Sequence, residues 1–330
     1  MGAVPMVELW RGGRMESRHL GHAVVWHATG GLVESWGNAA EVIFPRSSCK
    51  MLQALPLLES GAGAGLRPEQ LALACASHQG AALHVDAVGR WLADMDMSES
   101  DLRCGCHEPG DRDERDRLIR GGESPCQIHN NCSGKHTGFL MLNRHLGGDA
   151  EYVLPDHPVQ QAVKQAFEEV TGETSPGYGI DGCSAPNHAT SVSGLARSMA
   201  AFAAATGGGD ARDRAMFALT RAMAAHPAHV AGETRACTEL MRAMGGRVAI
   251  KTGAEAVFVA IIPEKQLGIA LKIADGGTRA SEAAICALLV RHGVLEADHP
   301  ATRKRLNAVQ ANWRGVETGM VQLAPGFPAA

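Results

Sequence analysis

Ser47 and Lys50 stand three positions apart in residues 44–50, a stretch that runs directly into an apolar segment. Residues at i and i+3 lie on the same face of a helix, so the lysine amine can reach the serine oxygen. An amine that burial or a neighbouring cation keeps uncharged can accept the hydroxyl proton and make the serine a nucleophile. Arg46, beside the pair, offers a fixed cation suited to a substrate carboxylate. The segment therefore predicts a serine nucleophile with a lysine base.

An isolated Ser-x-x-Lys pattern is more often a helix cap followed by an exposed lysine. Other motifs in the chain are therefore needed to support a catalytic role. A Ser-Gly-Lys cluster begins at Ser133, and a Lys-Thr-Gly triplet begins at Lys251. Serine acyl-transferases carry such motifs in this order. Lys251 directly precedes the clearest predicted hairpin. A lysine at this position can point into an active-site cleft, or it can be exposed to solvent. Together the motifs favour an enzyme with a covalent serine intermediate.

A second group of reactive side chains surrounds Cys132. Cys132, Lys135 and His136 stand at i, i+3 and i+4 at the start of a predicted helix, and Cys183 follows in a turn. Two thiolates and a third donor would form a tetrahedral zinc site with one open position. Because a lysine must lose its proton before it binds a metal, sequence chemistry alone nominates His136 as the third ligand. The alternative is a pair of buried, inert cysteines.

A rival metal site lies in residues 104–131, which are rich in Gly, Asp, Cys and His and are expected to be irregular. Its donors have local spacings typical of zinc sites. They are Cys104, Cys106, His107, Cys126 and His129. Because all of them lie in one predicted loop, we rank this set below the Cys132 group.

Strands predicted near both ends of the chain enclose a mainly helical middle. The most economical topology is one antiparallel sheet built from both chain ends and covered by helices, which is an α+β fold. We divide the chain into a sheet lobe, residues 1–45 and 185–330, and a mainly helical lobe, residues 46–184. The active site is expected in the cleft between these lobes. Helices are predicted at 47–60 and 300–313, among others.

Composition excludes several classes of protein. The 31 basic and 35 acidic residues are spread without blocks, and the formal net charge is -4. Nucleic-acid binders and polybasic membrane anchors usually concentrate basic residues. No leader pattern or long apolar run is visible, so the nine cysteines are interpreted as cytosolic thiols or metal ligands. We expect a cytoplasmic enzyme for a small polar substrate, with no nucleic-acid or membrane partner.

The motifs taken together resemble those of the Rhizobium etli-type L-asparaginases (class 3, the asparaginase II family), which look like serine β-lactamases and glutaminases in fold. The resemblance covers nearly the whole chain and rests on residues 45–50, 76–80, 129–138, 179–183 and 251–255. It implies hydrolysis of L-asparagine to L-aspartate and ammonia, a β-lactamase/glutaminase-like fold, a Zn²⁺ ion and a homodimer.

Two serine–lysine pairs are implied by the resemblance. They fall on Ser47 with Lys50 and on Ser77 with Lys251. Ser77 opens the motif Ser-His-Gln-Gly at the end of a predicted apolar helix, where composition alone would make it an ordinary terminal residue. Arg46 would hold the α-carboxylate of the substrate.

The resemblance also implies which residues hold the metal. The zinc ligands fall on Cys132, Lys135 and Cys183, with Asp181 as a supporting carboxylate near the ligands and the substrate. His136, the ligand preferred on sequence chemistry, becomes a residue that contacts the substrate or supports a ligand.

Three other functions compete with asparagine hydrolysis. A β-lactamase or transpeptidase-like enzyme would share the Ser-x-x-Lys and Lys-Thr-Gly motifs, and a glutaminase would share the chemistry. A zinc or amino-acid sensor on a retired hydrolase scaffold is the non-enzymatic alternative. Two departures from the family pattern, Ala81 in place of an acidic residue and Ala256 in place of glycine, bear on substrate fit.

Overall fold

The computed structural model describes residues 2–328, and the chain forms two compact units. The sheet unit consists of the chain up to Ser48, Thr190–Ala204, and the chain from Glu239 onward. The helical unit consists of Cys49–Ala189 and Ala205–Thr238. Residues 205–238, which the sequence-based division placed in the sheet lobe, belong to the helical unit because their helix α9 (Ala211–Ala225) packs against several helices of that unit.

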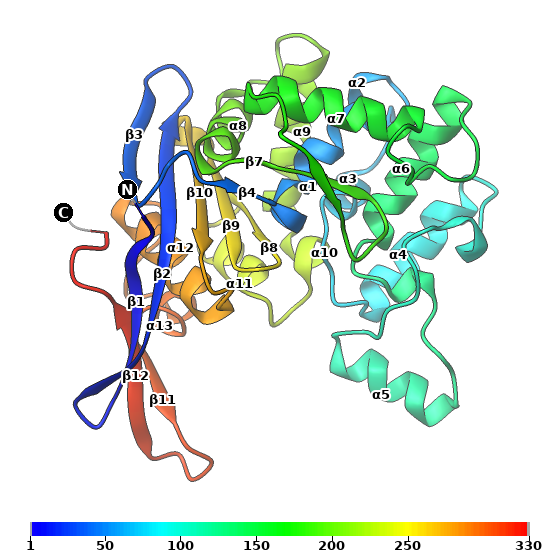
Figure 1. The fold of residues 1–330 in the computed structure, drawn as a ribbon. Coiled ribbons are helices and arrows are strands. Elements are labelled where there is room, and N and C mark those ends of the chain that lie inside the picture. The colour runs from blue at the N-terminus through cyan, green and yellow to red at the C-terminus, as the bar shows by residue number, and fades with distance from the viewer. Residues whose placement is uncertain (1, 329–330) are drawn as a thin grey trace. The chain divides into compact units, whose positions relative to one another are not determined.

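An antiparallel sheet of eight strands is the core of the sheet unit. Strands from the two ends of the chain pair directly: Val7 lies opposite Leu323, and Gly21 lies opposite Ile273 (Figure 1). The α+β class, with an antiparallel sheet built from both chain ends, is therefore confirmed. The order is β11 (Ala308–Ala311), β12 (Glu317–Leu323), β1 (Val4–Arg11), β2 (Arg14–His27), β10 (Leu267–Ile273), β9 (Val257–Ile262) and β8 (Ala249–Gly253), with β3 (Gly31–Trp36) paired to the second half of β2.

Strand β9 is apolar throughout because both faces of the sheet are covered at this strand. Every residue of β9 is buried, as expected for a strand between two layers. Helix α8 (Val192–Ala204) packs against β2, β9 and β10, and α12 (Thr278–Arg291) packs against β1, β9, β10 and β12. Shorter elements are β4 (Val42–Ile43), η1 (Arg46–Cys49), β7 (Thr190–Ser191), α11 (Ala236–Ala243), η4 (Pro263–Lys265) and α13 (Pro300–Arg303); η1 and α11 each run across the division between units.

Helix α6 (Ser133–Leu146) lies at the centre of the helical unit, and most of its residues are buried. It contacts α2 (Leu55–Glu59), α3 (Pro68–Ala74), α4 (Ala82–Ala93) and α7 (Pro158–Thr171). No helix within residues 2–328 is both long and apolar enough to cross a membrane. The other elements are α1 (Lys50–Gln53), η2 (Glu99–Asp101), α5 (Arg112–Gly121), η3 (Gln127–His129), β5 (Tyr178–Ile180), β6 (Pro186–His188) and α10 (Pro227–Ala231).

Three local predictions were wrong. The predicted helix at 47–60 is divided into η1, α1 and α2, and Pro56 lies in the first turn of α2, where a proline is tolerated, rather than inside a continuous helix. Helix α5 lies inside residues 104–131, which were expected to be irregular. Its sequence has hardly any apolar periodicity, and it is begun instead by the Asp111 cap and supported by charged pairs. The predicted helix at 300–313 ends at Arg303, because β11 pairs with β12.

Candidate active site

Lys50, the first residue of α1, is buried inside the helical unit and is only 1% exposed. Its Nζ donates hydrogen bonds to the backbone oxygen of Ala76 and to Cys132 Sγ, the latter at 3.0 Å. Ser77 follows Ala76 directly, is also buried, and donates its backbone N–H to Val230 O at 2.9 Å. The structure thus brings the predicted base, one predicted serine and one predicted zinc ligand into one cluster. The contact between Lys50 and Cys132 was not predicted.

A glycine in the first turn of α6 allows this cluster to form. A Cβ atom on Gly134 would lie 2.6 Å from the backbone oxygen of Leu73 in α3. Any side chain would therefore push α6 away from α3 and displace Cys132, two residues before the glycine, and Lys135, directly after it. This explains in physical terms why the Ser-Gly-Lys motif carries glycine at its centre.

Cys183 lies in the tight turn between β5 and β6, which Asp181 closes by donating its N–H to Ala185 O at 2.9 Å. This turn places the second thiol against α6. Lys135 Nζ donates to Cys183 Sγ at 3.1 Å, and Cys132 and Cys183 share a hydrogen bond. All three predicted zinc ligands are therefore together and buried.

The protonation of the two thiols is linked. Their hydrogen bond raises the pKa of Cys132 well above its ordinary value and holds the pKa of Cys183 well below it. Burial alone would lower the pKa of Lys135, but the neighbouring sulfurs of Cys183 and Cys132 outweigh burial and raise it. The pair therefore behaves as one thiolate next to an ammonium group. A bound metal ion would require Cys132 and Lys135 to release their protons.

His136 is held in one orientation by Tyr152. The phenol oxygen accepts the backbone N–H of Arg103 at 2.8 Å and lies 3.0 Å from His136 Nδ1. Tyrosine has one O–H to donate, so this geometry favours Nδ1 as the acceptor and leaves the ring proton on Nε2. Burial lowers the pKa of His136 to about 4, so the ring is neutral. Like the Lys135 ammonium, a ring protonated on Nε2 would have to lose that proton before this atom could bind a metal.

His78 is a positioning residue that the sequence did not reveal. It is buried, and its ring lies 3.0 Å, Nε2 to Oγ, from Ser133, whose own hydroxyl donates to Ile128 O at 2.8 Å. His78 Nδ1 accepts the N–H of Gly80 at 3.1 Å, so a neutral ring donates through Nε2. Burial, and to a smaller extent His84, lowers its pKa well below the ordinary value. His78 therefore fixes the segment that carries Ser77 to the start of α6.

In the sheet unit, Ser47 and Lys251 lie on neighbouring pieces of chain. A Cβ atom on Gly253, at the end of β8, would lie 2.6 Å from Pro45 O and 3.1 Å from Ser48 N, so only glycine lets the strand pass this closely. Ser48 fixes the same turn by donating its hydroxyl to Pro45 O at 2.7 Å. Lys251 is 1% exposed, and its Nζ donates to Thr252 O at 2.7 Å.

Each predicted serine–lysine pair joins residues of different units. Ser47 belongs to the first segment of the sheet unit, which ends at Ser48, and Lys50 belongs to the helical unit, although they are three residues apart in the chain. Ser77 and Lys251 are likewise assigned to different units. Both pairings therefore remain predictions.

The rival zinc set is not assembled. Within the described residues, no three His, Cys, Asp or Glu side chains gather as metal ligands. Cys104 is buried and donates to Gln127 O at 3.5 Å, whereas Cys106 is exposed. Cys126 and His129 contact each other, Sγ to Nδ1, at 3.3 Å, and the other ring nitrogen faces Glu114 at 3.4 Å. These donors are engaged locally and do not converge.

Comparison with known proteins assigns the chain to a class and then to a family. The sequence matches a family of amidohydrolases, enzymes that hydrolyse an amide bond, over residues 7–323. The chain belongs to the L-asparaginase II family. The predicted resemblance is therefore confirmed. No curated protein matches the chain significantly.

Several solved structures are similar to the chain over most of its length. A putative β-lactamase from Bacteroides dorei DSM 17855 is 11% identical, with 83% of this chain and 93% of that chain covered and a TM-score of 0.48. A β-lactamase from Mycobacterium bovis is 14% identical, with coverage of 83% and 95% and a TM-score of 0.40. The native form of Mglu is 12% identical, with coverage of 84% and 66% and a TM-score of 0.43. The family assignment rests on the sequence match alone.

Proposed function

We propose that this amidohydrolase converts L-asparagine to L-aspartate and ammonia. The observation that carries the proposal is the match to the L-asparaginase II family over residues 7–323. The buried cluster of Lys50, Cys132, Lys135 and Cys183 supports it, because a structural role gives no reason to bury two lysines beside two thiols. A glutaminase remains the nearest alternative, since rejecting one extra methylene by fit is worth only about 1–3 kcal/mol.

In the proposed reaction, Lys50 accepts the hydroxyl proton of Ser47, and the serine oxygen attacks the side-chain amide carbon of asparagine. The tetrahedral intermediate collapses when the carbon–nitrogen bond breaks, and the leaving nitrogen gains a proton and departs as ammonia. Ser77 and Lys251 would relay that proton. Water then hydrolyses the ester on Ser47, releases aspartate and returns the proton to the serine. Arg46 would bind the α-carboxylate throughout.

Zinc is proposed as a cofactor held by Cys132, Lys135 and Cys183, with Asp181 supporting them. The donor set fits, because sulfur and nitrogen ligands are those that Zn²⁺ prefers. Bound there, the ion would supply Lewis-acid polarisation near the substrate. Lys50 contacts Cys132, so the proposed base would touch one of the proposed zinc ligands. A homodimer and a cytoplasmic location remain proposals from the sequence.

Two assays on the purified protein separate the proposed activity from its rivals. We expect ammonia and aspartate to appear from L-asparagine in equal amounts, with a lower kcat/KM for L-glutamine. Nitrocefin should remain intact, because a β-lactamase would open its ring. Nitrocefin hydrolysis without ammonia release would favour the β-lactamase-like alternative, and inactivity in both assays would favour the sensor.

A further inference from the structure

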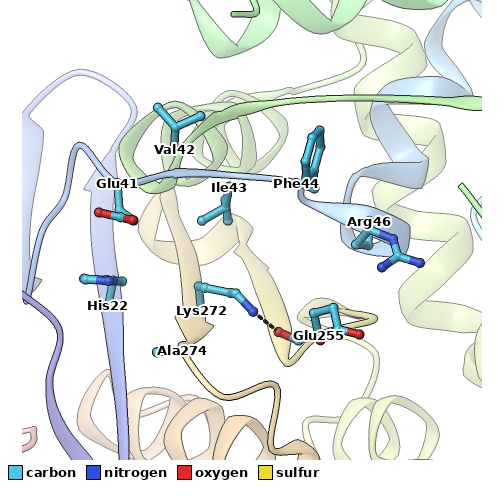
Figure 2. Close-up of a pocket in the computed structure, with 9 residues that line it drawn as sticks. All are labelled: His22, Glu41, Val42, Ile43, Phe44, Arg46, Glu255, Lys272 and Ala274. Carbon is cyan, nitrogen blue, oxygen red and sulfur yellow. Dashed lines mark hydrogen bonds between the residues drawn. The ribbon is translucent and has the colours of Figure 1, made fainter. Parts of the chain in front are cut away.

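A cavity of about 360 Å³ opens in the sheet unit beside the turn that carries Arg46 (Figure 2). Small molecules usually occupy cavities of roughly 300–1,000 Å³. The side chains of residues 42–44 and Ala274 form an apolar wall. We call this cavity the charged pocket, because the rest of its lining consists of His22, Glu41, Arg46, Glu255 and Lys272.

The charges in this pocket balance. Arg46 and Lys272 contribute two positive charges, and Glu41 and Glu255 contribute two negative charges. His22 accepts the backbone N–H of Asn38 on Nδ1 at 2.8 Å, and burial lowers its pKa, so the ring is neutral with its proton on Nε2. A polyanion such as a nucleotide would need an excess of cations. A lining with two charges of each sign is complementary instead to a small ligand that carries both signs.

The two ends of such a ligand have distinct partners. Lys272 lies on β10, and its Nζ donates to the backbone oxygen of Glu255 in the turn after β8, as the dashed line in Figure 2 shows. Burial lowers the pKa of Lys272, Glu255 and Asp275 oppose this effect, and the nearby Arg46 adds a smaller lowering. A carboxylate of the ligand placed between Lys272 and Arg46 would stabilise these two cations, which repel each other. The Glu255 side chain is itself a carboxylate and can bind an ammonium group of the ligand.

Two residues that line this pocket have a strained backbone. Arg46 has a φ of 51° and Glu255 a φ of 57°, and Ala256 follows with 56°. A residue other than glycine in this left-handed region costs about 1–2 kcal/mol. Such strain is often found where a side chain must be held in a functional position.

The pocket also adjoins the proposed nucleophile within the same unit. Arg46 directly precedes Ser47 in the chain. Gly253, which lies two residues before Glu255, packs against Pro45. In asparagine the side-chain amide lies close to the α-carbon, so groups that recognise the α-substituents must lie close to the nucleophile. Arg46, the residue that precedes Ser47 in the chain, is among the residues that line the charged pocket.

We propose that the charged pocket binds the α-ammonium and α-carboxylate groups of the amino-acid substrate, with Glu255 facing the ammonium and Lys272, beside Arg46, facing the carboxylate. This inference rests on the proposed function and adds Glu255 and Lys272 as specificity-determining residues. Neither takes part in the bond changes, so their loss should weaken recognition of the substrate and leave the chemistry intact.

Steady-state kinetics of Glu255→Gln and Lys272→Gln test the assignment. Loss of one charge-assisted contact should raise KM for L-asparagine by roughly 10–100-fold, with kcat within about threefold of wild type. Succinamic acid lacks the α-ammonium, so Glu255→Gln should leave its kcat/KM unchanged. 3-Aminopropanamide lacks the α-carboxylate, so Lys272→Gln should leave its kcat/KM unchanged. Glu264→Gln is the matched control, because Glu264 pairs with Arg247 outside the pocket and should behave as wild type.

Calorimetric titration of L-asparagine into Ser47→Ala separates the two levels of the proposal. If the wild type releases no ammonia, the proposed function fails. Weaker binding of asparagine to Ser47→Ala protein that also carries Glu255→Gln or Lys272→Gln would still support the assignment of the pocket as an amino-acid site. Unchanged binding and unchanged KM in both variants would overturn the pocket assignment. The pocket assignment would also be overturned if the variants keep the wild-type KM for asparagine but their activity at saturating asparagine responds differently to a second amino acid. That result would indicate an effector site.

Discussion

Replacing Lys50 with alanine is expected to lower kcat for asparagine hydrolysis by roughly 10²–10⁴-fold, because proton transfer by a positioned base contributes about that much. Ser47 would keep its hydroxyl but lose the group that accepts its proton. The measurement is ammonia release at saturating substrate, with the acylation rate from rapid-quench experiments.

A second variant is needed because Lys50 also supports the fold. Its removal leaves Ala76 O without its donor and opens a cavity, which together should destabilise the protein by about 1–3 kcal/mol. Lys50→Met keeps most of the side-chain volume, so it should fold and still be inactive. Lys164→Ala, at a half-exposed lysine paired with Glu168 on α7, is the control and should keep full activity. Near-native turnover by a folded Lys50→Met would exclude Lys50 as the base.

Replacing Cys132 with serine is expected to remove most of the bound zinc, because a hydroxyl is a far weaker zinc ligand than a thiolate. Metal content is measured on protein purified without chelator, by elemental analysis. Cys106→Ser is the matched control, since this exposed cysteine lies outside the buried cluster and should leave zinc stoichiometry unchanged.

Proton release adds a readout that does not depend on activity. Zinc binding to the metal-free wild type should release protons, because Cys132 and Lys135 must both be deprotonated in the complex. Cys132→Ser should release fewer protons. Full zinc content in Cys132→Ser, or metal binding without proton release, would contradict the ligand assignment.

Much of the sheet could be predicted from the sequence, because its strands are apolar runs with turn residues between them. β9 and β10 are buried almost throughout, so their patterns were clear. Helix α5 was missed for the opposite reason, since its surface is mostly exposed and its charges hide any apolar stripe. β11 was missed because its strand conformation depends on pairing with β12.

The candidate site was predictable only where its residues form compact motifs. Ser47 and Lys50 are close in the chain, so spacing alone suggested their chemistry. The contact between Lys50 and Cys132 joins residues 82 positions apart, and no local pattern could reveal it. The charged pocket is similar, because it draws His22 from β2 and Lys272 from β10, strands that become neighbours only in the folded sheet.

The most direct test of the account is to stop the reaction of the wild type with L-asparagine within milliseconds by acid and to map the modified residue by mass spectrometry. We expect an aspartyl ester on the peptide that contains Ser47, formed in a burst before steady state and absent from Ser47→Ala. An ester on Ser77 instead, or complete turnover with no covalent adduct on either serine, would contradict the claim that a lysine one helical turn away makes Ser47 the nucleophile.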